Sequence, residues 1–342
     1  MFEQPSFWGV IVFVALLAYL LGVRRRGGAH NAPVVKSAPT VPAMPARKPG
    51  SVSGAAMQLV DVRSWGYQLQ DLDLVRAAAS PFDLLVIDYT KDGSEATRLK
   101  PAEIERLKHK PDGARRIVLA YVSIGEAESY RPYWQAAWKR DKPDWLLRES
   151  RDWPENYSVC FWEPGWQSLM CGSADAYLDR VQAQGFDGVY LDKCDVYEDL
   201  QAHEKKIAAT RPQIERDMVV FVQTISRHMK ARDPNFIVIM QNAESLLSHP
   251  ELVAAIDGVA KEELVYGVDG PEKKNGDDEI AWSKACLDRA RGAGKPVFVV
   301  EYLNAREKIA KAVQAIEGYG YVTYIAPKDR QLKRLNYDVL EA

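Results

Sequence analysis

Eight short apolar runs, separated by stretches of helical periodicity, constrain the fold of this 342-residue chain more than any other feature. Several are continuous Val, Ile and Leu runs, which are typical of strands buried on both faces. Alternation of strand and helix predicts a parallel sheet, and eight repeats predict closure into a (β/α)8 TIM barrel. The runs lie at 64–69, 82–89, 116–124, 186–192, 235–242, 256–263, 296–302 and 321–326.

An open doubly wound α/β sheet is the alternative fold. It would require a glycine-rich phosphate loop after the first strand, and the sequence at 66–73, GYQLQDLD, has none. Helical periodicity between the apolar runs supports the barrel. The predicted helices lie at 101–109, 174–184, 203–231, 249–255, 277–292 and 305–318.

The N-terminal residues predict a separate membrane segment. Residues 7–23 form an uncharged apolar run long enough to span a bilayer, and Arg24–Arg26 follow it. A cleaved signal peptide is the competing interpretation, but its basic residues should precede the apolar run. The predicted domains are a transmembrane anchor with a basic flank at 1–26, a flexible Pro/Ala/Gly-rich linker at 27–60, and the barrel at 61–342.

The side of the membrane is predicted by two features that disagree. The positive-inside rule places Arg24–Arg26 in the cytoplasm, and the barrel with them. A Pro-rich tether of this kind commonly holds an enzyme off an outer membrane face. We therefore expect a membrane-anchored protein with a periplasmic or extracellular barrel. Arg24–Arg26 favour the opposite side of the membrane.

Charge and rare residues exclude several functional classes. A formal net charge of -2 argues against a nucleic-acid partner, which requires a basic face. The five His and four Cys lack the spacing of a zinc site and give little support to a Cys-His or Ser-His nucleophile. Cys160 and Cys171 could form a disulfide or remain buried thiols. No metal or cofactor is expected.

The carboxyl ends of the apolar runs provide candidate site residues, because barrel enzymes build their active sites there. These ends repeatedly place a carboxylate at the rim, rather than Lys or Ser. The clearest case is GVYLD, which runs into Asp192 and is followed by Asp195, Glu198 and Asp199. The candidates at these ends are Asp88, Glu126, Asp192, Asn242, Glu262, Glu301 and Tyr302, with Glu263 as a competitor of Glu262, and Tyr67 lies near a rim loop.

Paired carboxyl groups can hydrolyse a glycosidic bond, because one donates a proton to the leaving oxygen while the other attacks the anomeric carbon or activates water. Mutual repulsion between such acids keeps one of them protonated near neutral pH. A hard-cation site involving Asp192, Asp195 and Asp199 is an alternative. Asp195, Glu198 and Asp199 could also simply cap and solvate the next helix.

The motifs SWGYQLQ, FDLLVIDYT, VLAYVSIGEAESYRPYW, GFDGVYLDKCDVYE and VFVVEYL together resemble glycoside hydrolase family 114, and more closely its branch of extracellular hydrolases found in bacteria and archaea. The resemblance runs from Val62 to Ala326. It implies a (β/α)8 barrel that hydrolyses an amino-sugar polymer, the type activity being endo-α-1,4-polygalactosaminidase. A polysaccharide is therefore the expected substrate.

The resemblance also implies roles for individual residues. The family's strand-four aspartate falls on Asp192, for which we expect the role of nucleophile, and its second acid falls on Glu262, for which we expect the role of acid/base; the reverse assignment stays open. Glu244 and Glu263 compete for the second role. Lys193 and Lys261 depart from the family pattern, which has Asn beside each acid. Cleft-lining positions fall on Asp88, Tyr121, Glu126 and Asn242.

Two other functions remain open at this point. The chain could be a catalytically inactive carbohydrate-binding barrel at the cell envelope, because a fold does not fix its function. It could also be a metal-dependent hydrolase using Asp88, Asp192 and Asp195. Finally, residues 130–172 form a Trp-rich insertion that we expect to build one wall of the cleft.

Overall fold

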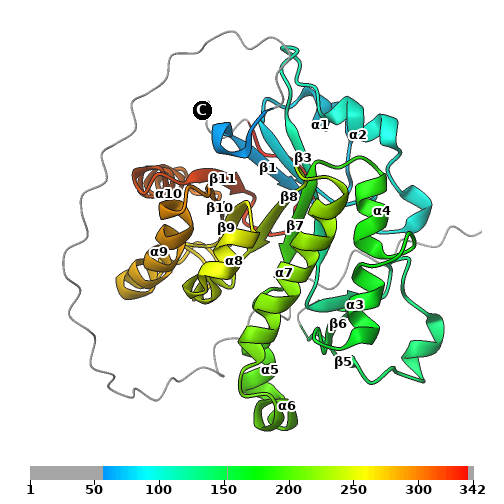
Figure 1. The fold of residues 1–342 in the computed structure, drawn as a ribbon. Coiled ribbons are helices and arrows are strands. Elements are labelled where there is room, and N and C mark those ends of the chain that lie inside the picture. The colour runs from blue at the N-terminus through cyan, green and yellow to red at the C-terminus, as the bar shows by residue number, and fades with distance from the viewer. Residues whose placement is uncertain (1–56, 152, 338–342) are drawn as a thin grey trace, which may run out of the picture. The chain divides into compact units, whose positions relative to one another are not determined.

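The eight predicted strands pair into one parallel sheet in which neighbours in sequence are neighbours in space (Figure 1). A computed structural model describes residues 57–151 and 153–337. The order of strands never reverses, so the doubly wound alternative is wrong. The strands are β1 (Trp65–Gln68), β2 (Leu84–Ile87), β3 (Ile117–Ser123), β7 (Gly188–Asp192), β8 (Ile237–Gln241), β9 (Gly258–Glu262), β10 (Val297–Tyr302) and β11 (Val322–Ala326).

The first and last strands approach each other and nearly close the sheet. The indole N–H of Trp65 on β1 donates a 3.1 Å hydrogen bond to the carbonyl of Val322 on β11. The Trp65 ring also lies against Phe298 and Tyr324, with centroid distances of 5.7 and 5.6 Å. Side chains thus fill the interior, as expected for a small barrel. This arrangement fits the (β/α)8 barrel.

Aspartates at the opposite, amino-terminal ends of the strands set the register. Asp83, Asp187 and Asp257 each immediately precede a strand. Asp187 accepts a 2.9 Å bond from the N–H of Val118 on the preceding strand, and Asp257 accepts a 2.8 Å bond from Val238 in the same way. Each of the three aspartates also pairs with a lysine, which neutralises it; the partners are Lys110, Lys108 and Lys230. This end of the barrel is a structural layer.

The helices follow the predicted periodicity except in one region. The single helix expected at 203–231 is instead two helices, at 205–210 and 214–232, because Arg211 precedes Pro212 and leaves the helical conformation there. The helices are α1 (Leu74–Ala79), α2 (Pro101–Leu107), α3 (Pro164–Met170), α4 (Tyr177–Ala183), α5 (Val196–His203), α6 (Lys205–Thr210), α7 (Ile214–Arg232), α8 (Pro250–Ala255), α9 (Asp277–Gly292) and α10 (Arg306–Gly318). Short 3-10 turns lie at Leu59–Asp61, Glu95–Thr97, Ala136–Lys139 and Glu244–Ser248.

The Trp-rich insertion folds as a small unit with its own antiparallel sheet. Its strands β5 (Leu146–Glu149) and β6 (Asn156–Val159) pair with β4 (Glu126–Glu128), which lies just before it, in the order β4-β6-β5. Its rings form a continuous series, in which Trp138 lies 5.3 Å from Trp134 and 5.0 Å from Trp145. These tryptophans therefore bury one another. The insertion's role as a cleft wall stays a prediction.

The predicted transmembrane helix is corrected. The stretch at 7–23 lies outside the described residues, and within 57–151 and 153–337 no helix is long and apolar enough to cross a bilayer. The longest of these helices, α7, carries Glu215, Arg216 and Asp217 in its first turn, which is the pattern of a helix with a solvent-facing side. The membrane-anchored localisation rested on that segment alone, so it is corrected as well.

Candidate active site

Two carboxyl groups lie at the carboxyl ends of neighbouring parts of the barrel. Asp192 ends β7, the fourth barrel strand, and Glu262 ends β9, the sixth, with β8 between them. Both side chains belong to the predicted rim. The strand order therefore brings together two acids that are separated by seventy positions in the sequence.

Asp192 is held by two hydrogen-bond donors. The phenol of Tyr121 donates to Oδ2 at 2.6 Å, and the backbone N–H of Lys193 donates to Oδ1 at 2.7 Å. Lys193 has a φ of 59°, a left-handed conformation that is costly for a residue with a side chain. Burial, reinforced by the nearby charge of Glu262, raises the pKa of Asp192 to about 7. Near neutral pH this carboxyl group is therefore present in both its ionised and its protonated form.

Glu262 is held by three side-chain donors. The phenol of Tyr302 donates to Oε1, and the amides of Gln241 and Asn242 donate to Oε2 at 2.6 and 3.2 Å. The backbone N–H of Glu262 in turn donates to Oδ1 of Asn242 at 3.1 Å. Burial raises the pKa of Glu262, while the bonds from Tyr302 and Asn242 oppose this rise. The carboxyl group is thus fixed in orientation.

Tyr67 contacts residues that hold each of the two acids, and the ring of Tyr190 lies 5.3 Å from its own ring. The phenol of Tyr67 donates a 3.4 Å hydrogen bond to Oε1 of Gln241, the residue that holds Glu262. The Tyr67 ring lies 6.5 Å from the ring of Tyr121, which holds Asp192. Burial raises the pKa of both Tyr67 and Tyr190, and the charges of Asp192 and Glu262 raise it further. The charges of both carboxyl groups therefore act on both phenols.

The two competing acids are neutralised by bases. Glu263 forms an ion pair with Arg330, and Glu244 pairs with Lys261 at 3.1 Å. The hydroxyl of Ser283 also donates to Glu244 at 2.6 Å. By contrast, within the described residues neither Asp192 nor Glu262 forms an ion pair.

Asp88 and Glu301, two other predicted site residues, bond to other groups of the protein. Both oxygens of Asp88 contact the guanidinium of Arg131, at 3.0 and 2.7 Å, and Thr90 bonds to one of them. Glu301 is fully buried and accepts the backbone N–H groups of Val265 and Tyr266 at 2.7 and 3.1 Å. Burial raises the pKa of Glu301 to about 8. These contacts fix the adjoining loops, so a role in substrate binding stays a prediction.

The other predicted binding residues lie around the acid pair. Tyr121, Tyr302 and Asn242 bond directly to the two acids, whereas Tyr67 lies beneath them and is almost wholly buried. Glu126 is 4% exposed and pairs with Lys193 at 3.2 Å. The strand pattern or the family resemblance had placed all five at the cleft, and the tertiary structure shows which of them touch an acid.

Gln241 is the site residue that sequence reasoning overlooked. It lies next to the end of the apolar run at 235–242, and that position is the signal that could have identified it. Among the acids that follow Asp192, Asp195 is the N-cap of α5, and Glu198 and Asp199 lie in its first turn. Asp199 pairs with Arg148 at 2.8 Å. This placement supports a capping and solvating role for Glu198 and Asp199.

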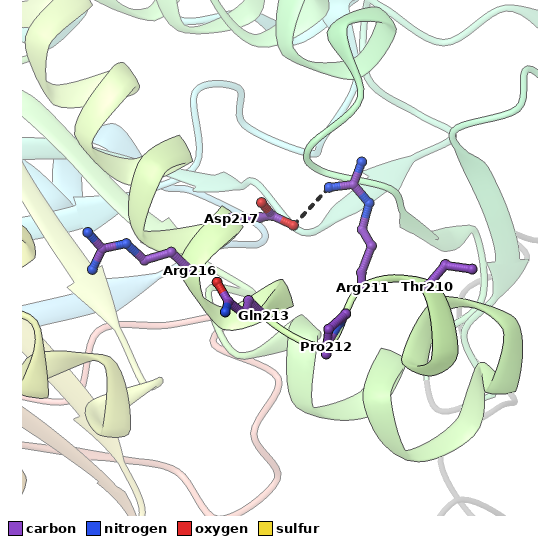
Figure 2. Close-up of a pocket in the computed structure, with 6 residues that line it drawn as sticks. All are labelled: Thr210, Arg211, Pro212, Gln213, Arg216 and Asp217. Atoms are coloured by element: carbon purple, nitrogen blue, oxygen red, sulfur yellow. Dashed lines mark hydrogen bonds and ion pairs between the residues drawn. The ribbon is translucent and has the colours of Figure 1, made fainter.

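A surface hollow lies elsewhere, at the turn between α6 and α7 (Figure 2). Here Arg211 pairs with Asp217 at 2.9 Å and lies over the ring of Trp162 at 4.6 Å. Neither Asp192 nor Glu262 lines this hollow, so it is separate from the acid pair. Its lining residues are Thr210, Arg211, Pro212, Gln213, Arg216 and Asp217.

The four cysteines are free thiols, so the alternative of a Cys160–Cys171 bridge is wrong. Burial raises the pKa of both Cys160 and Cys171 to about 11. Such thiols are protonated at neutral pH and are poor nucleophiles.

Comparison with known sequences identifies relatives over most of the chain. Residues 46–339 match the sequence model of glycoside-hydrolase family GH114. An uncharacterized protein of Methanocaldococcus jannaschii is 38% identical over 285 residues, which cover 80% of this chain and 78% of that protein. An uncharacterized protein of Deinococcus radiodurans is 37% identical over 300 residues, covering 86% of this chain and 87% of that protein.

Comparison with solved structures supports the same fold. The glycoside hydrolase domain of PelA from Pseudomonas aeruginosa superposes with a TM-score of 0.59 at 22% identity, over 80% of this chain and 97% of that domain. Aspergillus fumigatus Ega3, solved in complex with galactosamine, superposes with a TM-score of 0.59 at 18% identity, over 84% of this chain and 98% of that chain.

Proposed function

The chain belongs to glycoside-hydrolase family GH114, and from this membership we propose that Asp192 and Glu262 together cleave glycosidic bonds of an amino-sugar polysaccharide. The observation that supports this proposal is the pair of half-buried rim carboxyl groups, each held by neutral donors and each with a raised pKa. Two such groups can share a proton, so that one acts as an acid while the other is ionised.

In the proposed reaction Asp192 attacks the anomeric carbon while Glu262 donates its proton to the leaving oxygen. The glycosidic C–O bond breaks as a bond to the Asp192 carboxylate forms. Glu262, now ionised, then takes a proton from water, and the resulting hydroxide displaces Asp192 to release the sugar. Tyr121 and Tyr302 orient the two carboxyl groups by hydrogen bonding throughout. The assignment of roles follows barrels that use a strand-four aspartate as nucleophile.

The substrate proposed is a galactosamine-containing exopolysaccharide, cleaved as by an endo-α-1,4-polygalactosaminidase. Carboxylates outnumber bases around the site, since Glu126, Asp195, Glu244 and Glu263 accompany the two acids. A mouth with an excess of carboxylates attracts a polymer that carries free amino groups. The fold shared with Ega3, solved with galactosamine, agrees with this substrate class.

A reducing-end assay on partially deacetylated galactosamine and glucosamine polymers tests the proposal. We expect the parent to release reducing ends and both Asp192→Asn and Glu262→Gln to lose at least a thousandfold in rate. Lys230→Gln, at the far end of the barrel, is the control for handling and folding. Equal, near-zero rates for parent and variants on every glycan would instead favour a carbohydrate-binding barrel without turnover.

The roles of the two acids are separable by azide rescue. If Asp192 is the nucleophile, azide restores activity to Asp192→Gly and gives a glycosyl azide of inverted configuration. If Glu262 is the acid/base, Glu262→Ala accelerated by azide gives the retained anomer. The opposite pattern of products would reverse the assignment.

A further inference from the structure

Each of the two acids has a lysine as its immediate neighbour in sequence, and each lysine forms its ion pair with a different carboxylate. Lys193 follows Asp192, and its Nζ lies 3.2 Å from Oε1 of Glu126. Lys261 precedes Glu262, and its Nζ lies 3.1 Å from Oε1 of Glu244. The two acids are thus flanked by two separate Lys–Glu pairs.

The two pairs are built in the same way. Glu126 comes from the segment that follows β3, and β3 is the neighbour of β7, which ends in Asp192. Glu244 comes from the segment that follows β8, and β8 is the neighbour of β9, which ends in Glu262. In both cases, the lysine next to the acid forms an ion pair with a glutamate that follows the neighbouring strand in sequence.

Local backbone geometry fixes the first pair. A Cβ on Gly125 would lie 2.2 Å from the carbonyl oxygen of Lys193 and 2.6 Å from Val196, so only glycine fits there. This close approach brings the following residue, Glu126, beside the Lys193 side chain. The backbone of Lys193 has a left-handed conformation, so its side chain does not follow the alternation of side chains along the strand.

The second pair is fixed by a turn and a helix. Asn242 and Ala243 both have positive φ values, 56° and 49°, and this turn brings Glu244 back towards β9. Ser283 on α9 donates to the same oxygen of Glu244 that pairs with Lys261. Glu244 is therefore held from two sides, and Lys261 is held by it.

We propose that Glu126 and Glu244 are positioning residues, which keep the ammonium groups of Lys193 and Lys261 off the two catalytic carboxyl groups. An ammonium group that reached Asp192 or Glu262 would form an ion pair there and block the carboxyl group from the sugar. The inference rests on the proposed roles of Asp192 and Glu262. It reassigns Glu126 from substrate binding to the support of Asp192.

Other charged groups lie near the two acids and also affect their pKa values. Asp195 acts on Asp192, Lys193 and Lys261 alike, and Glu263 acts on Glu262 while paired with Arg330. The titratable groups facing Asp192 are Tyr67, Tyr121, Glu126, Tyr190, Lys193, Cys194, Asp195 and Glu262, and those facing Glu262 are Tyr67, Tyr190, Asp192, Lys261, Glu263 and Tyr302.

The test is a carboxyl-carbon NMR titration of the full chain labelled at Asp and Glu, with signals assigned from Asp192→Asn and Glu262→Gln. In Glu126→Ala the freed ammonium of Lys193 reaches Asp192, so the pKa of Asp192 should fall by about one unit. Glu244→Ala should lower the pKa of Glu262 in the same way. Each variant should move mainly the acid on its own side.

A double variant separates this effect from simple loss of structure. Glu126→Ala/Lys193→Met lacks both charges, so the Asp192 pKa should return close to that of the parent. Lys193→Met alone should raise it, because Glu126 then stays nearby without its cation. The control is Lys230→Gln, which breaks a Lys–Asp pair at the opposite end of β9 and should move neither acid.

Kinetics provide a second measurement. Glu126→Ala should lower kcat about tenfold and shift the acidic limb of the pH–rate profile to lower pH, with recovery in the double variant. An unchanged Asp192 titration and profile, with only a lower Tm, would overturn the inference. The NMR titration needs no substrate, so a failure of the proposed function, in which Asp192→Asn and Glu262→Gln remain active, would be recognised separately.

Discussion

The phenol of Tyr121 donates a 2.6 Å hydrogen bond to Oδ2 of Asp192, from one barrel strand to the end of the next. This bond stabilises the ionised carboxyl group and thus opposes the rise in pKa that burial causes. Substitution of Tyr121 should therefore change the pKa of Asp192 while the carboxyl group itself is kept.

Replacing Tyr121 with Phe should lower kcat about 10- to 100-fold, since a hydrogen bond to a charged group contributes about 1.5–3 kcal/mol. The pKa of Asp192 should rise, because the donor that favours its ionised form is gone. Steady-state kinetics across pH measure both effects. Tyr321→Phe is the matched control, because that phenol bonds to Asp288 at 2.9 Å, away from the two acids. Equal losses in the two variants would refute a specific role for Tyr121.

Replacing Glu262 with Gln should lower the pKa of Asp192. The charge of Glu262 is, after burial, the largest influence raising that pKa, and glutamine removes the charge while keeping the shape. The carboxyl-carbon titration of Asp192 measures the change. Replacing Glu301 with Gln, another buried rim acid, should leave the Asp192 titration unchanged. An Asp192 titration that does not move in Glu262→Gln would show that the two groups are not coupled.

Replacing Asp192 with Asn should stabilise the fold at pH 8. Folding raises the pKa of Asp192 from 3.8 to about 7, so the native state binds more protons than the unfolded chain between these values. Stability is consequently lost as pH rises through about 7. The asparagine side chain does not titrate, so this loss is absent in the variant. Its free energy of unfolding should exceed that of the parent by about 1–4 kcal/mol at pH 8 and by little at pH 4. Urea unfolding at both pH values measures the gain, and a gain independent of pH would contradict it.

Replacing Arg131 with Met should destabilise the protein by about 3–5 kcal/mol, because it leaves Asp88 and Glu128 as buried charges without a cation. Arg98→Met, which breaks an exposed pair with Glu95, should cost less than about 1 kcal/mol. Urea unfolding midpoints compare the two. A small loss in Arg131→Met would show that the buried ion pairs do not support the fold.

Chelation with EDTA should leave the proposed glycosidase activity unchanged. The metal-dependent alternative requires Asp88 as a ligand, but both of its oxygens contact Arg131, whose positive charge opposes a cation there. Activity measured before and after dialysis against EDTA tests this. Loss of activity that added Mg²⁺ or Ca²⁺ restores would support the metal-dependent hydrolase instead.

The local pattern of the sequence was sufficient for the strands and for most helices. Each apolar run specifies a buried strand by itself, and the residue at its end must lie at the rim, so Asp192 could be named in advance, as could Glu262 or its neighbour Glu263. Pro212 also indicates a break in the helix expected at 203–231, but the prediction of a single helix did not take it into account. What local sequence determines is the order of the elements and which residues end them.

Only the tertiary structure decided which of these rim acids have a basic partner. Asp88, Glu126, Glu244 and Glu263 resemble Asp192 and Glu262 in sequence, but each has a basic partner from another part of the chain. Those partners lie up to 67 positions away along the chain, as in the contact between Arg330 and Glu263. A carboxyl group's pKa depends on the charges and water around it in space, and folding alone brings those charges together.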